Sequence, residues 1–200
     1  MWERGWSFIK KAGTIILLST IVVWFTTYFG WAEDGFRMLS EEEIDYSILA
    51  RIGSLIAWIF APLGWGNWQA TVASVTGLVA KENIVGTLGI LYGGGEGTEY
   101  QTLGAAFTAV SGYSFLVFNL LCAPCFAAIG AIKREMNNTK WTWFAIGYQC
   151  GFAYLCALMV NQFGKAFTGD LSIIGLVAAI AALAFIIYML VRPYKEATKL

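Results

Sequence analysis

The chain has 200 residues, of which 58% are hydrophobic and 13% charged, whereas a soluble domain usually carries about 25% charge. This composition excludes an ordinary soluble domain and indicates an integral membrane protein. The formal net charge is zero and histidine is absent, which excludes a basic nucleic-acid surface, His-based acid–base catalysis and imidazole metal sites.

Apolar stretches predict an all-α integral membrane protein with about six transmembrane or half-membrane helices. A full span needs about 20 mostly apolar residues. Three stretches meet this without interruption: 13–31, 141–160 and 171–191. Three others are short or interrupted (48–62, 68–92 and 113–132), so we expect broken or re-entrant segments among them. Whether 48–62 and 68–92 cross fully or form a re-entrant hairpin stays open.

The expected domain boundaries follow from these stretches. Residues 1–12 mix tryptophans with basic residues and predict a cytoplasmic interfacial segment. Residues 13–191 form the helical permease domain, and residues 192–200 form a cytoplasmic tail. Residues 33–45 are expected to be an acidic external loop. Tryptophans near the expected span ends, Trp65 among them, are typical of interfacial anchoring.

Charge sets the expected orientation of the chain. With six crossings, nine of the thirteen basic residues fall on one side of the membrane, and most acidic residues fall on the other. The positive-inside rule then places both termini in the cytoplasm. Four crossings would give the same parity.

The first polar anomaly is Lys81-Glu82-Asn83, in the middle of an apolar stretch. A charge at the bilayer centre costs about 2.5–3.5 kcal/mol on insertion scales. If the helix breaks here, between Gly77 and Gly86, Lys81 ends one half-helix, and Glu82 and Asn83 begin the next, as the helix dipole favours. Broken helices of this kind line transporter substrate sites. The alternative is a buried Lys–Glu pair that orients neighbouring helices.

The second anomaly is Cys122-Ala-Pro-Cys125, where i, i+3 spacing predicts both sulfurs on one helix face. Pro124 has no N–H and frees the Leu120 carbonyl. Two thiols and a free carbonyl could bind a borderline transition metal in passing, or the cysteines could be small hydrophobic residues beside a kink. Gln149, in the fifth stretch, either lines a cavity or bonds to a neighbouring helix.

Three stretches together resemble the C-terminal membrane region of ferrous iron transport protein B. They are KAGTIIL from residue 11, APLGW followed by ATVASVTGLVAKENIVGTLGILY, and LLCAPCFAAIGAIKRE followed by WTWFAIGYQ. The resemblance covers about residues 5–165 and implies a Gate-type repeat within about 68–160. Related Gate repeats occur in nucleoside transporters and spore maturation proteins.

The resemblance implies a multi-pass ferrous iron importer of the bacterial inner membrane, with Fe²⁺ as the transported substrate and no tightly bound cofactor. The family's GTPase domain and earlier Gate repeat are missing here, and no P-loop motif occurs, so we expect a fragment or one half of a split protein that is not itself an enzyme. Expected partners are the bilayer, that N-terminal half, a small cytoplasmic protein and further copies of the chain.

The expected site has two groups of residues. With no histidine, carboxylate, amide and thiol groups must supply the metal ligands, namely Glu82, Asn83, Cys125 (on which the family's motif cysteine falls) and Cys122. Residues expected to shape the pathway or its gating are Lys81, Pro124 and Gln149. Two other functions stay open: a Gate-type nucleoside or organic-solute permease, and a membrane scaffold segment that transports nothing.

Overall fold

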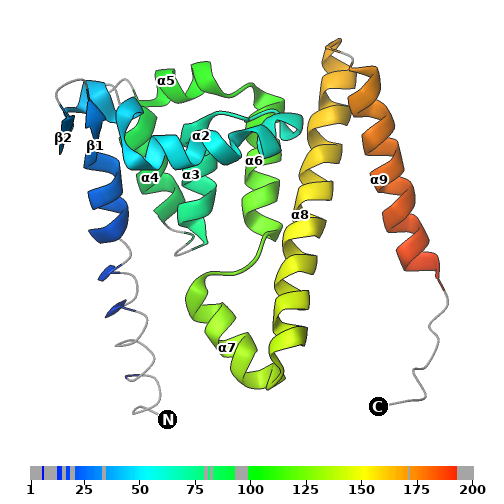
Figure 1. Cartoon of the computed structure of the whole chain (residues 1–200). Coiled ribbons are helices and arrows are strands. Elements are labelled where there is room, and N and C mark those ends of the chain that lie inside the picture. Colours follow the sequence, from blue (N-terminus) through cyan, green and yellow to red (C-terminus); the bar gives the residue numbers. More distant parts are fainter. Residues whose placement is uncertain are drawn as a thin grey trace.

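The computed structural model describes residues 6, 13–14, 17–18, 21–32, 35–78, 81, 83–92, 99–170 and 172–192. Helices dominate this part of the chain and confirm the all-α membrane fold (Figure 1). The interfacial segment predicted over 1–12, apart from Trp6, and the tail predicted over 192–200, apart from Arg192, lie outside the described residues. Glu82 lies outside them too.

The elements follow one another in a simple order. A small hairpin of β1 (Phe29–Ala32) and β2 (Gly35–Met38) leads through the 3₁₀ helix η1 (Glu41–Tyr46) into the helical body. The remaining elements are α2 (Ile48–Phe60), the 3₁₀ helix η2 (Ala61–Leu63), α3 (Trp68–Gly77), α4 (Asn83–Tyr92), α5 (Glu99–Ala106), α6 (Ala109–Leu121), α7 (Phe126–Met136), α8 (Thr139–Thr168) and α9 (Ile173–Val191).

Two described helices, α8 and α9, are long and apolar enough to cross a membrane. At 1.5 Å per residue, the 30 residues of α8 extend about 45 Å, which exceeds the ~30 Å hydrocarbon core. Helix α9 packs on α8 through the buried Ala179 and Ala182, while Ile173 and Ile174 are exposed and suit contact with lipid. The stretches predicted over 141–160 and 171–191 therefore correspond to real membrane-length helices.

The segment from α2 to α3 is sharply bent. The axis of α2 with η2 meets that of α3 at 94°, so the pair is one broken span or a re-entrant loop. Figure 1 shows α2 running across the direction of α8. Gly64 makes the turn possible because its φ of +90° lies in the left-handed region that glycine adopts without a steric penalty.

The first predicted span ends earlier than expected, and the acidic loop after it is ordered. The described helical residues stop at Tyr28, and Phe29 then pairs with Met38 to begin the antiparallel hairpin. Arg37 of β2 forms an ion pair with Glu43 of η1 at 2.7 Å. Within the acidic loop expected over 33–45, the described residues from 35 onward form β2 and most of η1, and this ion pair joins the two elements.

Trp65 lies at the centre of the core, not at an interface as predicted, with only 1% of its surface exposed. Its ring stacks on Phe60 at a centroid distance of 4.6 Å and meets Phe115 edge-on at 5.1 Å. Aromatic pairs of this geometry contribute about 0.5–1.5 kcal/mol beyond area burial. The turn after α2 is thereby anchored against α6.

Small residues bring α6 and α8 close together. A Cβ at Gly164 of α8 would collide with Val110 of α6, and Ala157 is fully buried between the helices. The Ser114 hydroxyl donates a hydrogen bond of 2.9 Å to the Ala157 carbonyl. Close backbone approach and interhelical hydrogen bonds are the usual means of helix association in membranes.

Candidate functional site: two broken helices joined by a lysine

The predicted helix break around Lys81 is confirmed, but its position differs. Helix α3 ends at Gly77, four residues before Lys81, and α4 begins at Asn83. Lys81 therefore lies in the turn between the helices and does not end α3, contrary to the prediction. Ile84 packs directly on Gly77, where a Cβ would lie 2.5 Å from its Cδ1 atom, so α4 folds back onto α3 at this glycine.

A second break separates α6 from α7. Helix α6 ends at Leu121, and Cys122 and Cys125 both have extended backbones, with ψ angles of 170° and 160°. The two cysteines therefore do not share a helix face, and that prediction was wrong. Pro124 supplies no N–H and disfavours helical geometry in the residue before it, so the helix stops here instead of bending.

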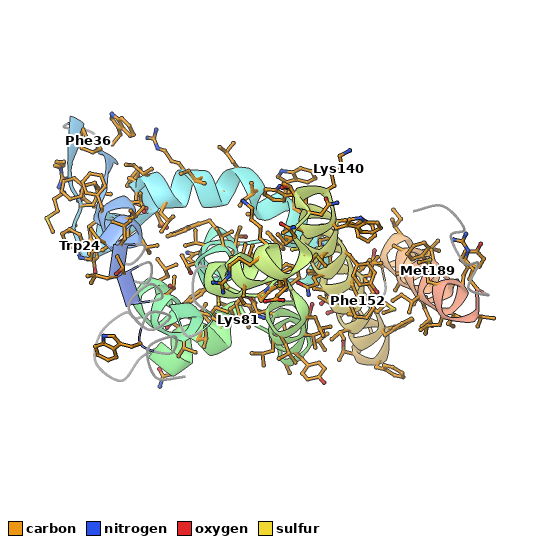
Figure 2. The ribbon with its side chains drawn as sticks, turned by 90° about the horizontal axis from the view of Figure 1, so that it is seen from below. Trp24, Phe36, Lys81, Lys140, Phe152 and Met189 are labelled. Atoms are coloured by element: carbon orange, nitrogen blue, oxygen red, sulfur yellow. The ribbon has the colours of Figure 1, made fainter. Side chains whose placement is uncertain are left out.

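Lys81 joins the two breaks. Its Nζ donates hydrogen bonds to the backbone carbonyls of Asn119 at 2.9 Å, Leu120 at 3.1 Å and Cys122 at 3.5 Å. The predicted freeing of the Leu120 carbonyl is thus confirmed, because that carbonyl accepts from a side chain. A cation at a helix C-terminus is favoured by the helix dipole. The Lys81 ammonium thus compensates the C-terminal dipole of α6, and the residue is half-buried; Figure 2 shows it near the middle of the view.

The thiols lie beside this contact. Cys122 is buried, and its Sγ is 3.5 Å from the Asn119 carbonyl oxygen, whereas Cys125 is half-buried at the start of α7. Neither belongs to a disulfide. Among the described residues, no group of three or more cysteines and carboxylates is placed to hold a metal ion. Of the other two expected ligands, Glu82 lies outside the described residues, and for Asn83 the structure describes the backbone, at the start of α4.

Asn119 is a polar residue that the sequence reasoning missed. It is 6% exposed, and its Nδ2 donates to Ser74 Oγ at 3.2 Å and to the Phe115 carbonyl at 2.8 Å. Its Oδ1 is buried without a hydrogen-bond partner within the described structure, as is Oε1 of Gln149 on α8. An asparagine within the apolar stretch 113–132 was a usable signal, since polar residues inside a membrane are costly.

Neutral side chains satisfy the other helix end in this region. The Pro62 carbonyl, after α2, accepts hydrogen bonds from Asn161 Nδ2 at 2.9 Å and from Gln162 Nε2 at 2.7 Å. The Tyr154 hydroxyl donates to the Ile59 carbonyl at 2.7 Å. All three donors come from α8, which therefore supplies the hydrogen bonds that the end of α2 lacks.

Charge is divided between the two ends of the molecule. Figure 1 shows the α7–α8 connection and the end of α9 at one end, and the hairpin and the α8–α9 turn at the other. The first end carries four described basic residues and one acidic residue (Lys133, Arg134, Lys140, Arg192 and Glu135). The second carries six described acidic residues and three basic ones (Glu41, Glu42, Glu43, Asp45, Glu99 and Asp170, with Arg37, Arg51 and Lys165). The division agrees with the charge asymmetry read from the sequence.

Comparison with known proteins gives a consistent relationship. A family model named Gate and described as "Nucleoside recognition" matches residues 9–139. The chain is 40% identical to "Fe(2+) transporter FeoB" of Methanocaldococcus jannaschii over 168 residues, which is 82% of this chain and 25% of that protein. Identity to the protein of the same name from Staphylococcus aureus is 35% over 83% of this chain and 24% of the relative.

A third relative extends the same pattern. The "Fe(2+) transporter FeoB" of Campylobacter jejuni is 30% identical over 82% of this chain and 28% of its own length. The chain thus spans about a quarter of the length of the curated relatives it matches. No solved structure matches the chain.

Proposed function

Because this chain belongs to the Gate family and its relatives are named as Fe(2+) transporters, we propose that it forms part of the Fe²⁺ translocation pathway of a ferrous iron importer. The chain supplies the helical membrane portion. A GTPase domain and a first Gate repeat would come from an N-terminal half, and a small cytoplasmic protein and further copies of the chain complete the proposed assembly.

The observation that carries this proposal is the meeting of two broken helices at Lys81. Free backbone carbonyls are tolerated at membrane depth only where they are buried in protein or line a water-filled path. Broken helices in transporters use such groups to replace the water around an ion. Here the turn before α4 meets the end of α6 and the residue just after it, Cys122.

The proposed pathway uses the residues around the breaks. Cys125 and Cys122 supply thiols, Glu82 a carboxylate and Asn83 an amide, a mixed set that suits a borderline metal such as Fe²⁺. Pro124 keeps the α6–α7 break open, and Lys81 and Gln149 control passage. Acidic groups at the hairpin end would concentrate cations there. In this arrangement both termini are cytoplasmic and the protein resides in the bacterial inner membrane.

The test is iron uptake by the full-length transporter that contains this chain. We expect Cys125→Ser and Glu82→Gln each to lower the rate of ⁵⁵Fe²⁺ uptake into proteoliposomes about tenfold or more, since even outer-shell changes cost 10–100-fold at metal sites. Cys156→Ser, on α8, and Glu135→Gln, at the exposed end of α7, are matched controls that should leave uptake unchanged. Normal uptake by both test variants would refute the assigned ligands.

A Gate-type nucleoside or organic-solute permease is the second candidate, and the description "Nucleoside recognition" given to the matching family favours it. In that case, the same proteoliposomes would accumulate radiolabelled uridine, and Cys125→Ser would not affect the rate. A scaffold segment would give neither iron nor uridine uptake from a folded, membrane-inserted protein.

A further inference from the structure

The end of α6 has the chemistry of a cation-binding site. Three backbone carbonyls, those of Asn119, Leu120 and Cys122, converge on one atom, the Nζ of Lys81, at 2.9–3.5 Å. Rings of backbone carbonyls are the groups that replace the hydration shell of ions in channel filters. The lysine ammonium is itself a compact, strongly hydrated point charge. Lys81 therefore occupies the position that a free cation would take.

No described carboxylate balances the charge of Lys81. Within the part of the chain that the structure describes, the ion pair found is Arg37–Glu43, which belongs to the hairpin end. The compensation seen for Lys81 comes from carbonyl dipoles and from the C-terminus of α6. This arrangement would serve a mobile cation equally well.

Asn119 also carries a buried side-chain oxygen, on the face of α6 toward α3. Asn119 Oδ1 is buried, has no partner within the described structure, and is 3.8 Å from the position of a Cβ built on Gly77. A buried acceptor without a donor is destabilising, because it has lost its hydrogen bonds to water without replacing them. Asn119 thus offers both its backbone carbonyl to Lys81 and a side-chain oxygen that nothing described uses.

The end of α2 shows that a charge is not required to satisfy carbonyls in this protein. There, amide and phenol donors from Asn161, Gln162 and Tyr154 serve the carbonyls of η2 and α2. An ammonium in the same role carries an added desolvation cost, because a charge is harder than a neutral donor to place among apolar helices. That cost is explained if the charge itself has a function.

We propose that the carbonyl cluster of Asn119, Leu120 and Cys122 is a divalent-cation site, and that the Lys81 ammonium occupies this site at rest. The ammonium holds the site closed at rest and must withdraw before a transported cation enters. This inference rests on the proposed iron-transport function, because it assigns Lys81 the role of a plug on that pathway. Lys81 is not one of the metal ligands tested in the uptake experiment above, so its role is tested separately.

The experiment measures cation binding by thermal unfolding of the purified full-length protein, with Mn²⁺ as the probe. Mn²⁺ suits carbonyl oxygen ligands and does not oxidise readily as Fe²⁺ does. We expect Lys81→Met to show a saturable rise in Tm with Mn²⁺ that is larger than the rise in the wild type. At about 100 times Kd, the unfolding equilibrium shifts about 100-fold toward the folded state. Lys81→Arg, which keeps the charge, should behave as the wild type.

Controls separate this role from simple support of the helix end. Lys140→Met removes an exposed lysine at the start of α8, far from Lys81 in Figure 2, and should leave the Mn²⁺ response unchanged. If Lys81→Met does not fold, Lys81→Gln keeps neutral donors for the carbonyls. A rise in Tm, or a return to the folded state, of either Lys81 variant on addition of Mn²⁺ supports the proposal. If Mn²⁺ changes neither the Tm nor the folding of these variants, the proposal is overturned.

The result is distinguishable from failure of the proposed function. A Mn²⁺-dependent Tm in Lys81→Met would stand even if the transporter carried an organic solute and no iron. Conversely, iron uptake that depends on Cys125 would stand even if Lys81→Met bound no Mn²⁺. In proteoliposomes, a plug role further predicts at least a tenfold higher Mn²⁺ influx without added nucleotide in Lys81→Met than in Lys140→Met. Equal Mn²⁺ influx in these two variants would refute the role of Lys81 in blocking cation entry.

Discussion

The turn at Gly64 gives the sharpest test of the packing described above. Gly64 has a φ of +90°, and a Cβ there would collide with Oδ1 of the fully buried Asn161 and lie 2.9 Å from its Cγ and 3.1 Å from its Nδ2. The whole amide would have to move away from its hydrogen bond to Pro62. Gly64→Ala should therefore lower the free energy of unfolding by more than backbone strain alone would.

The magnitude follows from two contributions. A left-handed conformation costs a non-glycine residue about 1–2 kcal/mol, and a buried polar group that loses its partner costs about 1–3 kcal/mol. We expect Gly64→Ala to lower the free energy of unfolding by about 2–5 kcal/mol. Gly169→Ala is a matched control, since Gly169 has a φ of +93° with nothing within 4 Å, and it should show the backbone cost alone.

The assay is unfolding of the purified full-length protein in detergent, followed by tryptophan fluorescence. The double variant Gly64→Ala with Asn161→Ala supplies a second check, because removing the amide removes the collision. The double variant should lose less free energy of unfolding than the sum of the losses in the two single variants. Equal costs for Gly64→Ala and Gly169→Ala would refute the reasoning, as would strict additivity in the double variant.

Two further predictions follow from other contacts. Gly164→Ala should cost about 1–3 kcal/mol, because its Cβ would collide with Val110, whereas Gly147→Ala, with open space around it, should be neutral or stabilising when Tm is compared. The pKa of Glu43 is lowered from its ordinary 4.5, mainly by the hydrogen bond from Arg37 and less by those from the backbone amide and hydroxyl of Ser40. The folded pKa is below the unfolded one, so the contribution is present above the unfolded pKa and lost as pH falls through the folded pKa. Plots of Tm against pH for wild type and Glu43→Gln should therefore converge in acid, and a constant gap would contradict the assignment.

The break near Lys81 was predicted from the sequence, and the one at Pro124 was predicted as a kink, because each results from local chemistry. Charged residues in the middle of a span are too costly to leave in a continuous helix, and Pro124 removes an N–H where it stands.

Long-range contacts could not be predicted in the same way. The partners of Lys81 lie 38–41 residues away in sequence, and nothing in its immediate neighbours indicates that it reaches the end of α6. Trp65 looked like an interfacial residue because it lies near the end of an apolar run. Its burial depends on Phe60 and Phe115, and thus on how the bent α2–α3 pair packs against α6.

Helix α8 has a mechanical consequence for the rest of the fold. It contacts α6, α7, α9 and η2, and its side chains hold the end of α2 through Tyr154, Asn161 and Gln162. A tilt of this one rod would carry the elements on either side of the α6–α7 junction and the corner between α2 and α3 at the same time. A force applied at its exposed first turn, beside Lys140, would therefore be transmitted along α8 to both the α6–α7 junction and the α2–α3 corner.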